Sequence, residues 1–363
     1  MDKFILSGEE KAVFALRSLY KKYGYAQYKM SKFEEYDLYA KNKDFLVSDN
    51  VITFTDTDGK LLALKPDVTL SIIKNDKDNP DSIKKVYYNE HVYRVSKGTK
   101  SFKEIMQIGL ECVGAIDDYS VVEVLYLALK SLDEICTENV LDLSHLGIVK
   151  SVLDYTKVSE MSKDEIVSCL NEKNLQGVQK VADNEGLDEK RKALLEKLVT
   201  VYGSAQKVEE ELDFFAVDDN TKRAVENLKG VIASLKALKV IDNVRIDFSV
   251  TSDFNYYNGV VFKGFVSGIP TSILSGGQYD NLMNKMGRKS KAIGFAVYLD
   301  EIERLNEDKE EFDVDVAVQY GQISIEKVNV TVSKLIGEGK TVFAGKTIPE
   351  TVKYRQLLTI GEE

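Results

Sequence analysis

Several residue types that particular classes of protein require are scarce in this sequence. Its 363 residues include no tryptophan, four prolines, three cysteines and two histidines. The cysteines, Cys112, Cys136 and Cys169, lack metal-ligand spacing, and two histidines are too few for a histidine-rich metal site. No apolar run approaches the roughly 18 residues that span a bilayer, and no signal peptide precedes Phe4. We therefore expect a cytoplasmic protein with reduced thiols, no metal or other cofactor, and no membrane partner.

Positive charge is also scarce. The chain carries 49 lysines and arginines against 59 aspartates and glutamates, which gives a net charge of −10. The basic residues are interleaved with acids, as in residues 188–191, and form no basic stripe. Because nucleic-acid binding needs lysine and arginine concentrated locally to neutralise phosphates, we expect no nucleic-acid partner. The length allows one large core plus a smaller unit.

Two segments have the spacing of a helix capping box, in which a serine is followed three residues later by a glutamate. Ser7 and Glu10 precede an amphipathic run that ends at Gly24. Ser120 and Glu123 precede a second run rich in leucine. Both patterns predict helices that pack one face on a core.

A β-hairpin is predicted between the apolar runs 51–55 and 61–64, because an Asp-Gly pair separates them. The second run leads into residues 65–69, which include Asp67 and Thr69. These two side chains can cap the helix that follows, contact a ligand, or do both.

Residues 104–114 predict a strand with two different faces. Alternate positions are apolar on one face, while Gln107, Gly109 and Glu111 share the other. A sheet that is buried on one side and holds a polar ligand on the other produces this pattern. A strand with one face in solvent produces a similar alternation.

The stretch 250–305 organises the rest of the chain. Residues 255–262 and 292–296 are typical of strands, and Gly276-Gly277 is typical of a turn that opens a helix through Met286. Tyr256 and Tyr257 would place an aromatic wall and two hydroxyls on opposite faces of one strand. Together these features predict a pocket for a small polar ligand.

The order of elements predicts four segments. The core would consist of residues 1–138 and 244–306, interrupted by a helical insertion at 139–243. A charge cluster at 307–311 indicates a linker. The tail, 307–363, would contain a strand at 314–318, a helix at 324–336 and a strand at 341–344.

These motifs, in this order, resemble histidyl-tRNA synthetase. Residues 255–262 and 276–280 are similar to two signatures of its catalytic core, residues 65–69 to its R-P-E/D-x-T segment, and residues 107–111 to its Q-x-G-x-E segment. The resemblance covers roughly residues 4–305. It is closer still to the synthetase's non-catalytic relative, the regulatory subunit of ATP phosphoribosyltransferase.

The resemblance implies an α+β fold of the class II aminoacyl-tRNA synthetase type. An antiparallel sheet would be flanked by helices, with a helical insertion and a small α/β unit at the C-terminus. The first helix would lie at a dimer interface.

The resemblance also implies a pocket for histidine. Asp67, Thr69 and Gln107 would surround the amino group of the ligand, while Glu111 and Tyr257 would contact its imidazole. The full set of candidate histidine-binding residues is Asp67, Thr69, Gln107, Glu111, Tyr256, Tyr257, Gly276, Gly277 and Tyr279.

The sequence departs from the synthetase at positions that serve ATP chemistry. Ser252 and Glu301 stand where the synthetase has arginines, and Ser96 replaces the acid of its second motif, although Arg94 persists. Gln278 replaces a third arginine. Adenylate formation needs cations around the developing phosphate charge, so these changes predict that the activity is lost. The tail is also shorter than the family's anticodon-binding domain.

The resemblance therefore implies a non-catalytic regulatory subunit in the first step of histidine biosynthesis. Its partner would be the short-form catalytic subunit of ATP phosphoribosyltransferase, in a hetero-octamer with four chains of each kind, and L-histidine would be the feedback effector. Two alternatives remain, a divergent histidyl-tRNA synthetase-like enzyme and a free-standing amino-acid-binding protein.

Overall fold

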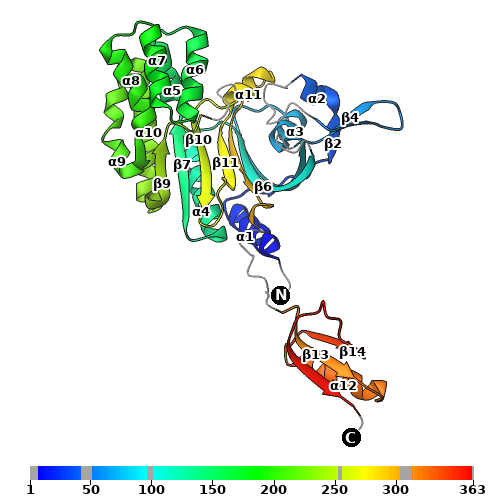
Figure 1. Cartoon of the computed structure of the whole chain (residues 1–363). Helices are drawn as coiled ribbons and strands as arrows, with labels where there is room; N and C mark the ends of the chain where they lie inside the picture. Colours follow the sequence, from blue (N-terminus) through cyan, green and yellow to red (C-terminus); the bar gives the residue numbers. More distant parts are fainter. Residues whose placement is uncertain (1–6, 42–50, 96–100, 252–255, 303–311, 362–363) are drawn as a thin grey trace. The chain divides into compact units, whose positions relative to one another are not determined.

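The structure of the protein is a computed structural model that describes residues 7–41, 51–95, 101–251, 256–302 and 312–361. The chain divides into two compact units, Met1–Arg304 and Leu305–Glu363 (Figure 1). The charged linker expected at 307–311 lies outside the described residues.

A nine-stranded sheet forms the centre of the first unit. In spatial order its strands are β1 (Ala26–Gln27), β5 (Ile83–Val95), β6 (Phe102–Gly114), β12 (Lys291–Tyr298), β11 (Leu274–Gln278), β10 (Val260–Val266), β7 (Asn139–His145), β9 (Val244–Asp247) and β8 (Tyr202–Ser204). Neighbouring strands are antiparallel except for the pairs β1–β5 and β7–β9. This largely antiparallel sheet confirms the predicted α+β class.

Helices α1 (Gly8–Lys22) and α4 (Asp118–Ile135) cover one face of this sheet. Tyr20 of α1 packs edge-on against Phe295 of β12, with ring centroids 6.0 Å apart. Leu132 of α4 lies over Gly264 of β10, where a Cβ would come within 2.8 Å of its side chain. The core of the unit therefore lies between these two helices and the sheet.

The two predicted capping boxes have different outcomes. Ser7 caps α1 and exchanges hydrogen bonds with Glu10, as predicted. The prediction for Ser120 was wrong, because the N-cap of α4 is Asp117, three residues earlier. Glu123 accepts a hydrogen bond from the Tyr119 hydroxyl at 3.0 Å and pairs with Lys85 of β5 at 2.7 Å.

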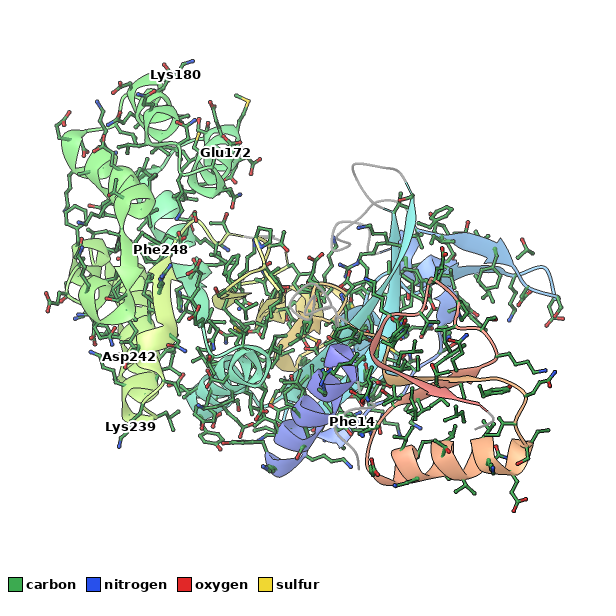
Figure 2. The ribbon with its side chains drawn as sticks, turned by 60° about the horizontal axis from the view of Figure 1, so that its bottom comes forward. Phe14, Glu172, Lys180, Lys239, Asp242 and Phe248 are labelled. Atoms are coloured by element: carbon green, nitrogen blue, oxygen red, sulfur yellow. The ribbon has the colours of Figure 1, made fainter. Side chains whose placement is uncertain are left out.

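The segment 139–243 starts with β7, which lies inside the main sheet, and then becomes helical. Its helices are α5 (Leu146–Thr156), α6 (Glu160–Asn171), α7 (Leu175–Asn184), α8 (Glu189–Thr200), α9 (Ala205–Glu209) and α10 (Asp219–Ala237). They gather at one end of the sheet (Figure 1). Phe248, which follows β9 (Figure 2), is fully buried against Phe215 of the short 3-10 helix Leu212–Phe215, with ring centroids 5.4 Å apart, and so joins this end of the sheet to the segment between α9 and α10.

The opposite end of the sheet carries α2 (Tyr36–Ala40), α3 (Val68–Asn75) and a small sheet of β2 (Phe33–Glu35), β4 (Leu61–Leu64) and β3 (Thr53–Thr55) (Figure 1). Strands β3 and β4 form the predicted hairpin. Gly59 in its turn has a φ of +81°, a conformation that glycine adopts without a steric penalty.

The organising stretch differs in detail from its prediction. Tyr256 and Tyr257 precede β10, so they belong to a loop and do not occupy opposite faces of a strand. Gly276 and Gly277 lie inside β11 and form no turn. The helix that follows, α11 (Asp280–Lys285), begins after Tyr279.

The second unit contains a parallel three-stranded sheet in the order β14 (Val342–Gly345), β13 (Val314–Tyr320) and β15 (Tyr354–Ile360), together with α12 (Ile325–Gly337). The sequence predicted the first two strands and the helix but missed β15. Among the described residues of both units, no helix is long and apolar enough to cross a membrane.

Candidate functional site

A cavity of about 280 Å³, called here the central cavity, lies over the middle strands of the nine-stranded sheet. Glu111 and Lys263 belong to the cavity face of their strands. Side chains alternate along a strand, so Phe262 belongs to the other face, where it packs on Phe295 beneath α1 while its strand still borders the cavity. Eight of the nine candidate histidine-binding residues line it: Asp67, Thr69, Gln107, Glu111, Tyr256, Tyr257, Gly276 and Tyr279.

Glu111 of β6 lies at one end of the central cavity and is 2% exposed. Its carboxylate oxygens accept hydrogen bonds from Thr69 Oγ1 at 2.8 Å and Tyr279 Oη at 2.6 Å. Gly294 of β12 lies directly opposite, where a Cβ would come within 1.8 Å of Glu111 Oε2. The absence of a side chain at Gly294 therefore makes room for the carboxylate.

Burial raises the pKa of the Glu111 carboxyl to about 8, although the hydrogen bonds from Tyr279 and Thr69 oppose this rise. The nearby Asp67 also raises it. Glu111 is therefore mostly protonated at pH 7 when no cation is beside it. A cationic ligand would favour the ionised form, because opposite charges within a few ångströms stabilise each other.

Asp67 combines the two roles that the sequence allowed. Its carboxylate caps α3 by accepting a hydrogen bond from the backbone N–H of Leu70 at 2.9 Å, and it also lines the central cavity. Burial raises its pKa, while the bond from Leu70 and the positive charge of Arg94 lower it. Arg94 Nε donates to the carbonyl oxygen of Pro66 at 2.9 Å and so holds the guanidinium beside Asp67.

The tyrosines form an aromatic wall even though they belong to a loop. The ring centroids of Tyr256 and Tyr257 are 4.6 Å apart, and Tyr279 lies 5.8 Å from Tyr256. Gly277 is not a lining residue, but a Cβ there would come within 2.7 Å of the Tyr257 ring. Gly277 therefore serves the wall indirectly, by letting Tyr257 pack on β11.

The structure adds lining residues that the sequence analysis missed. Lys263 of β10, Ser275 of β11 and Tyr298 of β12 lie on the cavity side of the sheet. Lys263 was overlooked because it stands in an otherwise apolar strand. The alternation of Val261, Lys263 and Phe265 was the signal that could have placed it on the same face as Glu111.

The positions at which the sequence departs from the synthetase lie outside the central cavity or outside the described residues. Glu301 is not among the residues that line the central cavity, and it accepts a hydrogen bond from Thr271 at 3.4 Å. Ser96 and Ser252 lie outside the described residues. Within the described part of the chain, no group of three or more histidine, cysteine, aspartate or glutamate side chains could hold a metal ion.

The central cavity is thus chemically polarised. The buried carboxyl of Glu111, the half-buried carboxyl of Asp67, an aromatic wall and the hydroxyl of Thr69 form one end. A lysine and two hydroxyls form the other. Carboxylates accept hydrogen bonds from ammonium and imidazolium groups, so the arrangement suits a small ligand with a cationic part. The volume is close to the roughly 300 Å³ at the lower end of small-molecule sites.

Comparison with known proteins gives relatives of two kinds. An ATP phosphoribosyltransferase regulatory subunit of Alkaliphilus metalliredigens is 28% identical over 289 residues, which cover 78% of this chain and 73% of that protein. A histidine–tRNA ligase of Methanocaldococcus jannaschii is 25% identical over 365 residues, which cover 96% of this chain and 86% of the ligase.

Solved structures share the fold. A protein of Bacillus halodurans described as an ATP phosphoribosyltransferase regulatory subunit/histidyl-tRNA synthetase has a TM-score of 0.77 at 22% identity and covers 98% of this chain and 94% of its own. A chain of an ATP phosphoribosyltransferase complex from Thermotoga maritima has a TM-score of 0.64 at 20% identity and covers 80% of this chain and 97% of its own.

The model of one family, described as histidyl-tRNA synthetase, matches residues 7–302, a span that contains the whole nine-stranded sheet and every residue of the central cavity. On the extent of that match, this chain belongs to the histidyl-tRNA synthetase family.

Proposed function

We propose that this chain is a non-catalytic regulatory subunit of ATP phosphoribosyltransferase, the enzyme of the first step of histidine biosynthesis. Relatives that carry this name match more than three-quarters of the chain. The observation that carries the proposal is an asymmetry. The amino-acid end of the central cavity is built from buried, hydrogen-bonded residues, whereas an acid, Glu301, stands where the synthetase has an arginine for ATP.

Adenylate formation cannot proceed well without that arginine. The reaction concentrates negative charge on phosphate oxygens, and enzymes stabilise this charge with arginine, lysine or Mg²⁺. A carboxylate at the same position would repel it. Arg94 is retained in the cavity, but its neighbour Asp67 offsets its charge. The site therefore favours binding of an amino acid over its activation.

The proposed partner is the short-form catalytic subunit of the same enzyme, in a hetero-octamer with four chains of each kind. The chain would also self-associate as a dimer through α1. Helix α1 buries Leu16 and Tyr20 in the core but leaves the Phe14 side chain 47% exposed, which supports a further contact on its outer side. L-Histidine is the proposed effector, with its amino and imidazole groups at the acidic end of the central cavity.

A second candidate function, that of a divergent histidyl-tRNA synthetase, is favoured by the Methanocaldococcus jannaschii ligase, which matches 96% of this chain. An assay of histidine-dependent exchange of pyrophosphate into ATP distinguishes the regulatory subunit from the synthetase. The purified chain should give no exchange above background. Exchange that disappears in an Arg94→Ala variant would establish the synthetase activity and overturn the proposal.

A further inference from the structure

The end of the central cavity that lies away from Glu111 is lined by hydrogen-bond donors. Lys263 of β10 and Ser275 of β11 are cross-strand partners on the cavity side of the sheet. The hydroxyl groups of Ser275 and Tyr298 lie 2.7 Å apart. This end therefore offers one cation and two hydroxyls, the reverse of the acidic end.

Lys263 is a cation of the cavity that makes no direct hydrogen bond or ion pair within the described part of the chain. Its cross-strand neighbour on β7 is Asp142, whose pKa burial raises to about 6 while the positive charge of Lys263 is among those that oppose the rise, so an anionic ligand group would share this lysine with Asp142. Arg94, the other cation that lines the cavity, lies beside Asp67 and bonds to the backbone of Pro66. A lysine left without a partner in a cavity is suited to an anionic ligand group.

Gln107 provides a second, independent indication. Its side chain is 3% exposed and lines the central cavity, yet its amide nitrogen has no hydrogen-bond partner within the described structure. Buried polar groups in folded proteins nearly always have a partner. Gln107 stands next to Tyr298 across β6 and β12, so the orphaned donor is adjacent to the hydroxyl pair.

The floor between the two ends carries almost no side chain. Gly294 and Ala296 of β12 line this floor, and Gly277 of β11 beside them is covered by the Tyr257 ring. Glu111 is in register with Val261, so Lys263 lies three strands across and two residues along from Glu111, and their backbones are about 16 Å apart. Both side chains line the cavity, and a space of this length suits a short dipolar molecule lying on the sheet.

We propose that Lys263 binds the carboxylate of the amino acid that occupies the central cavity, and so takes the part that the arginine missing at Ser252 has in the synthetase. The ligand class is then a zwitterionic α-amino acid with a second basic group, oriented with its basic groups toward Glu111 and Asp67 and its carboxylate toward Lys263. The family resemblance placed Gln107 at the amino group, but its unpartnered atom is the amide nitrogen, a donor, so in this proposal Gln107 donates to the carboxylate instead. The inference rests on the proposed function, because it takes L-histidine as the ligand.

Calorimetric titration of the full chain with L-histidine and with L-histidinol tests this assignment. L-Histidinol keeps the imidazole and amino groups but has a hydroxymethyl group where histidine has the carboxylate. The wild-type chain should bind histidine about 10- to 100-fold more tightly than histidinol, the range for one charge-assisted hydrogen bond. In the Lys263→Met variant this preference should disappear, because the affinity for histidine falls while the affinity for histidinol stays the same.

Two further variants make the result specific. Lys263→Arg keeps the positive charge and should keep the preference for histidine. Lys291→Met removes an exposed lysine from β12 outside the cavity and should behave as wild type. The assignment is wrong if the Lys263→Met variant retains the wild-type preference, or if its affinities for both ligands fall equally. Absence of histidine binding to the chain, alone or with its catalytic partner, would also overturn it, while activation of that partner would leave the proposed function standing.

Discussion

At the scale of single residues, the properties of the site depend most on Glu111. Its carboxyl is buried, bonded to Thr69 and Tyr279, and close to a second acid, Asp67. Two carboxyl groups close together in one cavity favour proton uptake unless a cation enters. The acidic end is therefore suited to a basic ligand, and without one the protonated form of Glu111 is favoured.

The raised pKa of Glu111 predicts that the stability of the protein depends on pH. Because the pKa of Glu111 is raised from 4.5 to about 8 by folding, its contribution to stability is fully present below pH 4.5 and is lost as the pH rises toward 8. The Glu111→Gln variant should escape this loss. Its free energy of unfolding relative to wild type should rise between pH 5 and pH 8 by up to about 3 kcal/mol.

Chemical denaturation in the absence of histidine measures this difference. Glu104→Gln is the matched control, because Glu104 lies on the same strand but is exposed and outside the cavity. Its pH profile should run parallel to that of wild type. A Glu111→Gln profile that also runs parallel would show that Glu111 is ionised in the folded protein across this range.

At the scale of elements, the close packing of β6, β11 and β12 creates the cavity. Strands β11 and β12 each contribute a glycine where a side chain from another segment needs room. Gly277 accommodates the Tyr257 ring and Gly294 accommodates the Glu111 carboxylate. The shape of the cavity floor therefore depends on which residues the strand register places opposite one another, as well as on the polar residues.

Gly294→Ala tests this role of register. The new Cβ would lie 1.8 Å from Glu111 Oε2 and 2.5 Å from the carbonyl oxygen of Leu110, which is backbone and cannot move aside easily. The variant should lose about 1–3 kcal/mol of stability, the usual cost of overpacking. Thermal unfolding should show a lowered midpoint.

Gly230→Ala is the companion substitution. Gly230 lies within α10, and a Cβ there would meet nothing within 4 Å. Alanine should raise stability by about 0.5–1 kcal/mol, since glycine costs that much in a helix interior. Equal effects of the two substitutions would contradict the packing argument for Gly294.

How much of these elements could be predicted depends on the range of the interactions that form them. The alternation in β6 is a local property, so Gln107 and Glu111 were placed on one face correctly. Gly276 and Gly277 were misread as a turn, because glycine is typical of turns and its use inside β11 depends on Tyr257 and Gly294 from other segments. Lys263 was missed for a different reason, because the local alternation that places it is hidden in an otherwise apolar strand.

At the scale of the whole molecule, the fold is that of the family, and the proposal concerns the chemistry that this fold supports. The acidic end of the cavity lies on the nine-stranded sheet, and Glu301 does not line the cavity and accepts a hydrogen bond from Thr271. The sequence predicted the fold class because its motifs occur in the family's order. It could not predict β15 of the second unit, whose pairing with β13 joins segments about 40 residues apart.

The central claim, that the chain regulates a catalytic partner, is tested most directly by mixing it with a short-form ATP phosphoribosyltransferase chain from the same organism. Size-exclusion chromatography with light scattering and a phosphoribosyl-transfer assay would be run on the same samples. The account predicts a complex larger than either protein and a transfer rate above that of the catalytic chain alone. Separate elution at micromolar concentrations, with an unchanged rate, would contradict it.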